Sequence, residues 1–483
     1  MAEEQPSETV QKQSKKRISF FSRILIILIV ILAYLVLKVT LIIIPYPTIS
    51  VDYMEEYSKV TRPDNYDPNE NAALYYKKAS EIFWDLPHVG EQQMYIWPSD
   101  INDAEVETGK KWLALNSEAV IYLKQAISKP YYWVHRDLPF SSQGMLGISL
   151  KDYDKLKFHH IASFLDLQAK VMMREGDTQR ALEYIVQLHK MGSHLCGPKT
   201  LIEQLVGLRF KRMAVDNILA VLDRGKFDSA TLKDWQDKLE NQIYNSRKEL
   251  DFRSEKFLAY DIIQRTFTDN GRGNGLLIPR SAAELLKPGI IYGVGTTETG
   301  IQRVYRDRYL NFFWLALVGP DRCKTVAFVD KYFSYADTLR HQTPFQLRKQ
   351  GIDSEEQIES MLKGYAIEKI ASVYHVIELW QRLRAKESAL ITTIAILRYK
   401  EDKEQLPESL DQLLSAGYLN QLPMDPYSDG PLVYRRQGDD FVLYSFGADF
   451  DDDGGVHSEW GKYSLGGDYV FWPVQKQEEK RVE

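Results

Sequence analysis

A run of alternating aspartates near the end of the chain has the spacing of a cation-binding loop. Asp449, Asp451 and Asp453 are each two residues apart, and Gly454 follows the last of them. Alternate carboxylates in a tight turn can surround one hard cation such as calcium, and glycine lets the backbone turn sharply. An exposed acidic turn that only ends a strand has the same composition, so the spacing leaves both interpretations open.

The same loop departs from the EF-hand pattern. A twelve-residue EF-hand loop beginning at Asp449 needs a bidentate glutamate at its last position. That position is Trp460, and Glu459 stands one place too early. A strand rather than a helix is also predicted just before the loop. We therefore expect another kind of calcium loop or a solvated acidic turn.

Other motifs for catalysis or nucleotide binding are missing from the sequence. The nine histidines include no HExxH pair, and His189 and His194 point in different directions on a helix. There is no GxSxG motif, and the glycine-rich stretches 270–275 and 293–300 have neither P-loop nor dinucleotide spacing. We predict a protein that is not an enzyme, and we interpret both glycine-rich stretches as exposed loops.

Composition further narrows the possible classes of fold and function. The 483 residues are too many for a single core, and an apolar fraction of 44% predicts that most of them fold. With 61 basic and 67 acidic residues, the net charge of -6 provides no basic field for nucleic acid. Cys196 and Cys323 lie in no metal-ligand spacing, and two unrelated buried thiols are favoured over a disulfide.

An apolar segment near the N-terminus predicts a membrane anchor. Ile24 to Ile44 contains one charged residue, Lys38, which lies near the outer end and can extend toward water. At about 1.5 Å per residue such a helix crosses the roughly 30 Å hydrocarbon core. Residues 24–45 are therefore predicted to bind membrane lipid as a transmembrane signal anchor.

The charges that flank this segment predict its orientation. Acidic residues follow it, starting at Asp52. The basic residues that precede it are Lys12, Lys15, Lys16, Arg17 and Arg23. The positive-inside rule then places residues 1–23 in the cytoplasm and the bulk in the periplasm or outside, on a single-pass protein of the cell inner membrane. No small-x-small cleavage site follows the apolar segment, whose next residues are Pro45, Tyr46 and Pro47, so we expect an uncleaved anchor.

Helical periodicity dominates the middle of the chain. Prolines mark residues 46–68 as an extended stem, and residues 69–375 are predicted to form an α-helical domain. Phe312–Val318 is too short to span a membrane and is predicted to lie in the core. Helices are expected from near Asn69 or Asn71 to Phe83, and over 117–127, 155–173, 178–188, 200–223 and 229–250.

Two of these helices resemble a tetratricopeptide hairpin near residues 160–195. Asp177 is placed to cap the second helix after the break at Gly176. The positions at the spacings of that repeat are Leu165, Ala169, Gly176, Ala181 and Ile185. The resemblance implies a groove that binds a protein partner. The alternative is that these helices pack only on one another.

The C-terminal residues 376–474 are predicted to form a small α+β domain with an antiparallel sheet, followed by a charged tail, 475–483. An amphipathic helix over 376–400 comes first, and a short helix through Leu413 follows. Two alternating stretches, 432–435 and 441–445, predict a hairpin whose turn is 437–440. The predicted fold class is mainly α, with a transmembrane helix at the N-terminus.

This C-terminal region resembles the globular domain of the major pseudopilin of type II secretion systems. The ordered motifs are Leu406-Pro407, Tyr418-Leu419, Leu422-Pro423, Asp425-Pro426-Tyr427, Ser445, Gly447-Ala448-Asp449, Gly454-Gly455 and Asp468. The resemblance implies a pseudopilin-like fold and a calcium site that includes Asp449 and Asp468. Asp451 and Asp453 join the predicted metal ligands from their spacing.

The processing site that precedes the N-terminal helix of a pseudopilin is missing. No glycine precedes Gly90 and no glutamate lies in the apolar segment, so prepilin processing is not expected. We therefore predict a membrane-anchored, non-enzymatic protein of the bacterial cell envelope, with a partner-binding helical domain and a calcium-stabilised C-terminal domain. The alternatives are a component of a type II secretion or pilus-like machine, and an envelope enzyme whose site in the helical domain is unrecognised.

Overall fold

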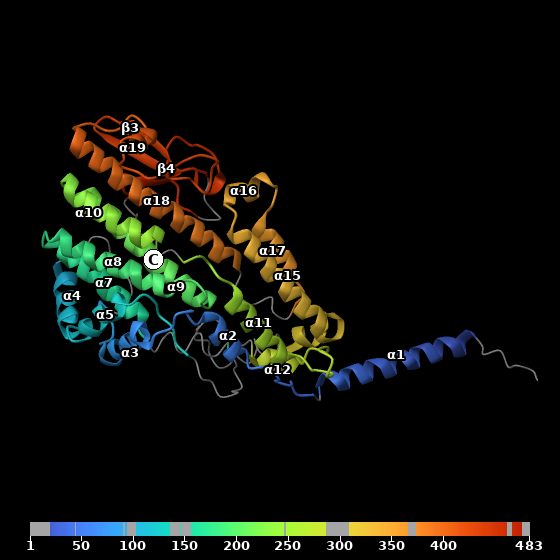
Figure 1. The fold of residues 1–483 in the computed structure, drawn as a ribbon. Helices are drawn as coiled ribbons and strands as arrows, with labels where there is room; N and C mark the ends of the chain where they lie inside the picture. The colour runs from blue at the N-terminus through green and yellow to red at the C-terminus, as the bar shows by residue number, and fades with distance from the viewer. Residues whose placement is uncertain are drawn as a thin grey trace, which may run out of the picture.

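The protein is mainly helical, with a small antiparallel sheet near its C-terminus (Figure 1). The predicted fold class is confirmed in this respect. The structure is a computed structural model, and it describes residues 20–43, 45–89, 92–93, 103–135, 145, 156–245, 248–285, 309–365, 373–460 and 466–475. The glycine-rich stretch 293–300, nearly all of the cytoplasmic tail 1–23 and most of the tail 475–483 lie outside the described residues.

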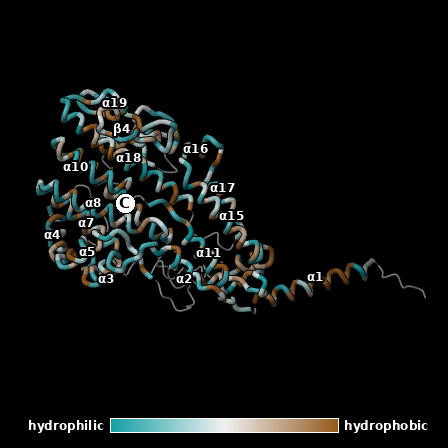
Figure 2. The backbone as a smooth tube through the Cα atoms, in the orientation of Figure 1, coloured by the Kyte–Doolittle hydropathy of each residue, from teal (hydrophilic) through white to brown (hydrophobic). Residues whose placement is uncertain are grey.

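Helix α1 (Phe20–Ile43) projects away from the body (Figure 1). Only 6% of its most apolar window is buried by the rest of the chain. Figure 2 shows the helix mostly in the hydrophobic colour. Its length and composition suit a membrane crossing, although a signal sequence has the same properties.

The outer end of α1 touches the body. Ile42 is fully buried, and helix α12 (Pro279–Leu285) lies against this end of α1. The Lys38 ammonium group donates a hydrogen bond to the carbonyl oxygen of Leu317. Lys38 was expected to extend toward water, but it has a protein partner.

The stretch predicted as an extended stem contains a helix, α2 (Tyr53–Thr61). The Asp52 side chain caps it by accepting from two backbone N–H groups. Helix α2 packs on α11 (Arg253–Thr266), and the Gln264 side chain of α11 bonds the backbone at Ser50 and Val51. Prolines on both sides concealed this short helix from the sequence pattern.

Two helices predicted near the start of the body are confirmed with small shifts at their ends. They are α3 and α5, which pack on each other. Tyr76 of α3 makes edge-on contacts with the rings of Tyr132 and Phe158. The elements of this part are α3 (Ala73–Ile82), β1 (His88–Val89), β2 (Gln92–Gln93), α4 (Asp103–Leu115) and α5 (Ala119–Ser128).

Three helices form the centre of the body: α7 (Phe158–Arg174), α8 (Thr178–His194) and α9 (Leu201–Arg224). Asp177 caps α8 by accepting from the Arg180 N–H at 3.1 Å, as predicted. Thr200 and Glu203 form a capping box at the start of α9. All three helices lie close to the predicted ranges.

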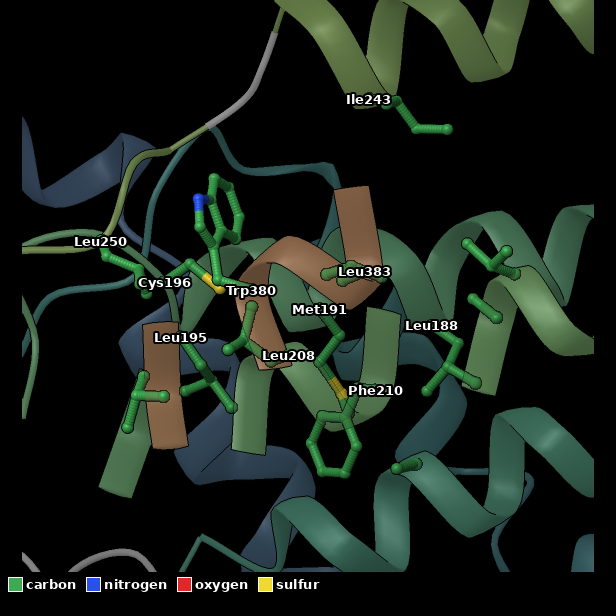
Figure 3. Close-up of a cluster of buried hydrophobic side chains, with 14 of the residues drawn as sticks. Leu188, Met191, Leu195, Cys196, Leu208, Phe210, Ile243, Leu250, Trp380 and Leu383 are labelled. Carbon is green, nitrogen blue, oxygen red and sulfur yellow. The ribbon is translucent and has the colours of Figure 1, made fainter. Parts of the chain in front are cut away.

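Helices α8 and α9 approach closely where two glycines meet. A Cβ atom added to Gly207 would lie 2.6 Å from the carbonyl oxygen of Gly192, so a larger residue at this position cannot fit without movement. Next to this crossing, Met191, Leu208 and Trp380 belong to one apolar cluster (Figure 3). The crossing sets the relative position of α8 and α9, each of which contributes a side chain to the buried polar cluster of the next subsection.

The next helices depart more from the sequence pattern. The helix predicted over 229–250 ends early, because α10 (Ser229–Glu240) passes into a π-helical turn, η2 (Asn241–Asn245). Asn270 and the residues to Gly273 are exposed, as predicted for that loop. Helices that the sequence patterns did not indicate are α15 (Arg322–Arg340), α16 (Pro344–Lys349) and α17 (Ser354–Leu362).

The prediction that Phe312–Val318 lies in the core is wrong. The segment belongs to a helix, Tyr309–Val318, in which only Ala316 is buried. Trp314 and Val318 are among the exposed apolar side chains of the chain. An apolar composition alone could not distinguish a core helix from one with an uncovered face.

Helix α18 (Val373–Lys403) lies between the helical body and the sheet (Figure 1). It packs against α9 and α10 on one side and against β4 and β5 on the other. The predicted helix 376–400 is confirmed within it, and α19 (Leu410–Ser415) is the short helix expected after it. The hydrophobic core runs without a break from the body through α18 to the sheet.

The sheet has the order β3–β4–β5, and all neighbours are antiparallel. The predicted hairpin is confirmed, because Gln437 pairs with Asp440 around a turn at Gly438-Asp439. Gly438 has φ +62, which favours glycine. The strands are β3 (Val433–Gln437), β4 (Asp440–Ser445) and β5 (Tyr469–Trp472).

Both cysteines are free thiols. Cys196 is buried beside the α8–α9 crossing, as expected. Cys323 is exposed, so the prediction of two buried thiols is wrong for this residue.

Candidate functional site

The acidic loop is held against the sheet by a buried aspartate. Asp425 accepts a hydrogen bond from the Ser445 hydroxyl at 2.7 Å and one from the Phe446 N–H at 3.0 Å. It also accepts from the Tyr427 N–H at 3.0 Å. Two of the motifs quoted above, 425–427 and 445–449, therefore meet in space and fix the start of the loop.

Asp449 stands at the end of a short 3₁₀ turn, η3 (Gly447–Asp449). One oxygen of its carboxylate accepts from the Gly467 N–H at 2.7 Å, and the other accepts from the Asp451 N–H at 3.3 Å. The structure thus brings Asp449 next to the chain segment that carries Asp468.

Asp468 is the only one of the four predicted ligands that is fully buried, with 0% of its surface exposed. One carboxylate oxygen accepts from the Gly455 N–H at 2.6 Å. The other, Oδ1, has no hydrogen-bond partner among the described residues. Burial raises the pKa of Asp468 to about 6, and the negative charges of Asp452 and Asp453 add to this effect.

The remaining two predicted ligands, Asp451 and Asp453, are exposed. The aspartate between them, Asp452, has a structural role instead. It accepts from the Tyr444 hydroxyl at 2.8 Å and from the Arg435 guanidinium group at 2.9 Å. All three aspartates from 451 to 453 are exposed, and Asp452, which is outside the alternating pattern, is the one whose carboxylate bonds other side chains of the described residues.

The donor set of this loop agrees in part with a calcium site. A buried carboxylate oxygen without a partner is costly unless a cation or a proton compensates it, and calcium prefers oxygen ligands. Asp449 accepts a hydrogen bond from the N–H group of Gly467, the residue just before Asp468, and can therefore supply a second carboxylate ligand. Among the described residues, however, no group of three or more Asp, Glu, His or Cys side chains has the geometry of a metal site. Residues 461–465, within the same loop, are not described.

A second polar cluster lies in the core, and the sequence analysis missed it. Glu387 of α18 is fully buried and lies 3.0 Å from His189 of α8 and 2.9 Å from the ammonium group of Lys211 of α9. Burial acts to raise the pKa of Glu387, but Lys211 and His189 together lower it to about 2. The carboxylate is therefore ionised and joins three helices.

The neighbouring residue, Lys386, extends this cluster toward the sheet. Its ammonium group bonds Asp216 of α9 at 2.5 Å and lies 5.0 Å from the ring centre of Tyr469 in β5. One signal in the sequence could have indicated the cluster. Glu387 occupies the same helical face as Leu383, four residues before it, and Leu390, three residues after it, where an apolar residue is expected.

The buried histidines among the described residues, His189 and His194, bond groups on neighbouring helices. Burial lowers the pKa of His194 to about 3, so this imidazole is neutral. Its Nε2 donates to the carbonyl oxygen of Lys129 at 2.9 Å, and its Nδ1 accepts from the Tyr76 hydroxyl at 2.9 Å. Both ring nitrogens are used in packing α3 and α5 against α8.

Another pair of buried acidic groups caps a helix. Burial raises the pKa of Glu255 to about 7, and the charge of nearby Glu203 adds to this. Glu255 accepts from the Leu201 N–H at 3.1 Å, at the N-terminus of α9. The positive end of the helix dipole favours carboxylates there, which gives both residues a structural role.

A cavity of about 380 Å³ lies beside the acidic loop. It is bounded by α15–α18 and by the loop residues Ala448 and Phe450. The Arg348 guanidinium group lies 4.7 Å from the ring centre of Phe450 and donates to the carbonyl oxygen of Asp449. The loop is thus tied to the helical body on this side.

Comparisons with known proteins assign no role to these sites. No protein-family model, no curated protein and no solved structure matches the chain.

Proposed function

We propose that this chain is a membrane-anchored, non-enzymatic protein of the bacterial cell envelope. Its anchor is α1, its bulk lies in the periplasm or outside, and its C-terminal unit is a pseudopilin-like domain stabilised by calcium. The observation that carries the anchor is the exposure of α1, an apolar helix of 24 residues that the body leaves almost uncovered. Such a surface is unfavourable in water and suits a bilayer.

The mature N-terminus tests the anchor. We expect the intact mass of the protein purified from membranes to include residues 24–45, and we expect alkaline carbonate to leave it in the membrane fraction. A signal sequence is the competing explanation. A mass that begins after residue 45 would contradict the anchor.

The calcium proposal rests on the buried Oδ1 of Asp468, which lacks a partner among the described residues. A bound calcium ion would supply the missing interaction and would favour the ionised carboxylate. Asp449 and Asp468 are the proposed carboxylate ligands. Asp451 and Asp453 would have to turn inward to join them.

Thermal unfolding of the full-length chain in detergent tests the calcium proposal. We expect 1 mM calcium to raise the Tm of the wild type and to leave Asp468→Asn unchanged. Asp439→Asn is the matched control, because Asp439 is an exposed aspartate in the hairpin turn. Equal calcium shifts in the wild type and Asp468→Asn would contradict the site. Loss of the shift in Asp451→Asn or Asp453→Asn would add that residue to the ligands.

The partner-binding part of the proposal is supported by a groove of about 380 Å³ between α7, α8 and α9. It has an apolar floor that includes Ala220 and Ile185, and it carries basic residues such as Arg174 and Arg224 at its rim. An Ala220→Trp variant would fill it. Pull-downs from solubilised membranes should lose a protein partner with this variant but not with Ile121→Trp on α5. Equal recovery with both variants would remove the groove from the proposal.

A further inference from the structure

The helix Tyr309–Val318 presents an uncovered apolar stripe. Leu310, Trp314 and Val318 are 50%, 64% and 79% exposed. They are four residues apart, so they follow one another along one face of the helix. A stripe of three large apolar side chains on a folded surface indicates contact with another apolar phase.

The opposite face fixes this helix to the body. Ala316 is buried, and Phe312 and Leu315 pack against the hydrophobic core. The chain leaves the helix at Gly319, where a Cβ atom would lie 2.4 Å from the carbonyl oxygen of Leu315, so this turn requires glycine. The stripe is therefore held in a defined position.

That position is beside the outer end of α1. Lys38 of α1 donates to the carbonyl oxygen of Leu317, in the last turn of the helix Tyr309–Val318. A cation at this end of a helix is also favoured by the helix dipole. Ile42, one turn beyond Lys38, is buried by the body. The body thus reaches along α1 as far as Lys38.

The contact between Lys38 and Leu317 defines how deep the helix Tyr309–Val318 lies in the membrane. Lys38 lies five residues before Ile43, the end of α1, which corresponds to about 7–8 Å at about 1.5 Å per residue. Helices that lie in the membrane interface bury their apolar face about 5–10 Å into the boundary between headgroups and acyl chains. Tryptophan is enriched at that level, because its ring is apolar and its N–H group is polar.

We propose that the helix Tyr309–Val318 is a second membrane contact, which inserts Leu310, Trp314 and Val318 into the outer interface of the bilayer beside α1. The inference rests on the proposed anchor, since the depth is counted along α1. The partner is the lipid of the same membrane, because the stripe and the anchor are joined through Lys38. Two contacts on one bilayer would hold the body in a fixed orientation.

Fluorescence quenching by lipids tests this contact in the full-length chain. The background variant is Cys323→Ser, which removes the exposed thiol and leaves buried Cys196. Single cysteines replace Trp314, Ile121 on α5 and Val30 in α1, and each carries an environment-sensitive fluorophore. Ile121 and Val30 are 60% and 61% exposed and so match Trp314 in accessibility. The protein is reconstituted in phosphatidylcholine vesicles without a quencher, with lipids that carry a quencher near the headgroup, or with lipids that carry one deep in the acyl chain.

We expect strong quenching at position 314, quenching at position 30 by lipids that carry the quencher deep in the acyl chain, and none at position 121. Quenching at position 30 but not at 314 would overturn the second contact and leave the anchor intact. Loss of quenching at both positions would overturn the anchor as well. A fluorophore at 314 that is shielded from water but not quenched by lipid would assign the stripe to a second copy or another protein. Equal quenching at 314 and 121 would show non-specific adsorption and would also overturn the contact.

Discussion

Two carboxylates in the C-terminal half of the chain are fully buried, but their surroundings are opposite. Glu387 lies between the ammonium group of Lys211 and the imidazole of His189, and its pKa is lowered to about 2. Asp468 accepts from the backbone N–H group of Gly455, forms no ion pair with a described basic side chain, and has a pKa raised to about 6. Both have 0% exposure.

The difference in surroundings separates a buried carboxylate with a structural role from one that can bind a ligand. The charge of Glu387 is compensated within the chain, so this cluster needs nothing from outside and joins α8, α9 and α18. The charge of Asp468 is not compensated by the described side chains, so a proton or a cation from solution would stabilise this group. Burial alone therefore does not indicate a ligand site, and the presence of compensating partners decides it.

The largest expected effect is that of Glu387→Gln. The substitution keeps the shape but leaves Lys211 buried without its counter-charge, and such losses cost about 3–5 kcal/mol. Urea denaturation of the full-length chain in detergent should show this decrease at pH 7. The deficit should shrink as the pH falls from about 4.5 toward 2, because Glu387 contributes its stability only while it is ionised.

An exposed ion pair is the control for Glu387→Gln. Lys233 and Asp237 on α10 are 2.6 Å apart, and both side chains are more than half exposed. Lys233→Ala should change the free energy of unfolding by about 0.5 kcal/mol or less. A similar loss in both variants would show that Glu387 is not held by its buried partners.

A smaller loss is expected for Gly207→Ala. The added Cβ atom would lie 2.6 Å from the Gly192 carbonyl oxygen and 2.9 Å from the sulfur of Cys196. Overpacking that pushes α8 away from α9 lowers the free energy of unfolding by about 1–3 kcal/mol. The same movement displaces Lys211 relative to Glu387. The midpoint of urea denaturation measures this loss. Gly430→Ala is a control for the loss of glycine itself, because nothing surrounds Gly430 within 4 Å and its φ is not in the left-handed region. Equal losses in both would argue against a tight crossing.

An effect of opposite sign is expected for Asp468→Asn without calcium. Because the pKa of Asp468 is raised on folding, the wild type loses stability as the pH rises from about 4 to about 6, and the variant does not. The Tm of the variant, measured with a chelator, should therefore exceed that of the wild type at pH 7.5 and equal it at pH 3.5. Calcium should reverse the order at pH 7.5. A variant that is less stable at pH 7.5 without calcium would show that Asp468 is compensated as Glu387 is.

Much of the fold could be predicted because its signals are local. The alternation over 432–445 indicates the hairpin, and the periodicity over 376–400 indicates α18. Asp177 is recognisable as a cap from its place after Gly176. The ends of elements were less well predicted, as in α10, where a π-helical turn replaces the last turns of the expected helix.

The candidate site could be predicted only in part. The spacing of Asp449, Asp451 and Asp453 treats the three alike, whereas the fold leaves two of them exposed and turns Asp449 toward Gly467. Asp468 entered the prediction through the resemblance rather than through its spacing. Its burial depends on the closing of the whole loop against β5, which no short pattern contains.

The sequence by itself determined the apolar helix α1, the helical body and the C-terminal hairpin, because hydrophobic periodicity and turn residues act over a few neighbours. Only the tertiary structure decided which charged groups are compensated. It brought His189, Lys211 and Glu387 together from three helices and left Asp468 without a full set of partners. It also left the stripe of the helix Tyr309–Val318 uncovered beside α1. These outcomes depend on contacts between residues that are far apart in the chain, and on the energy of burying charge and apolar surface, which no local pattern encodes.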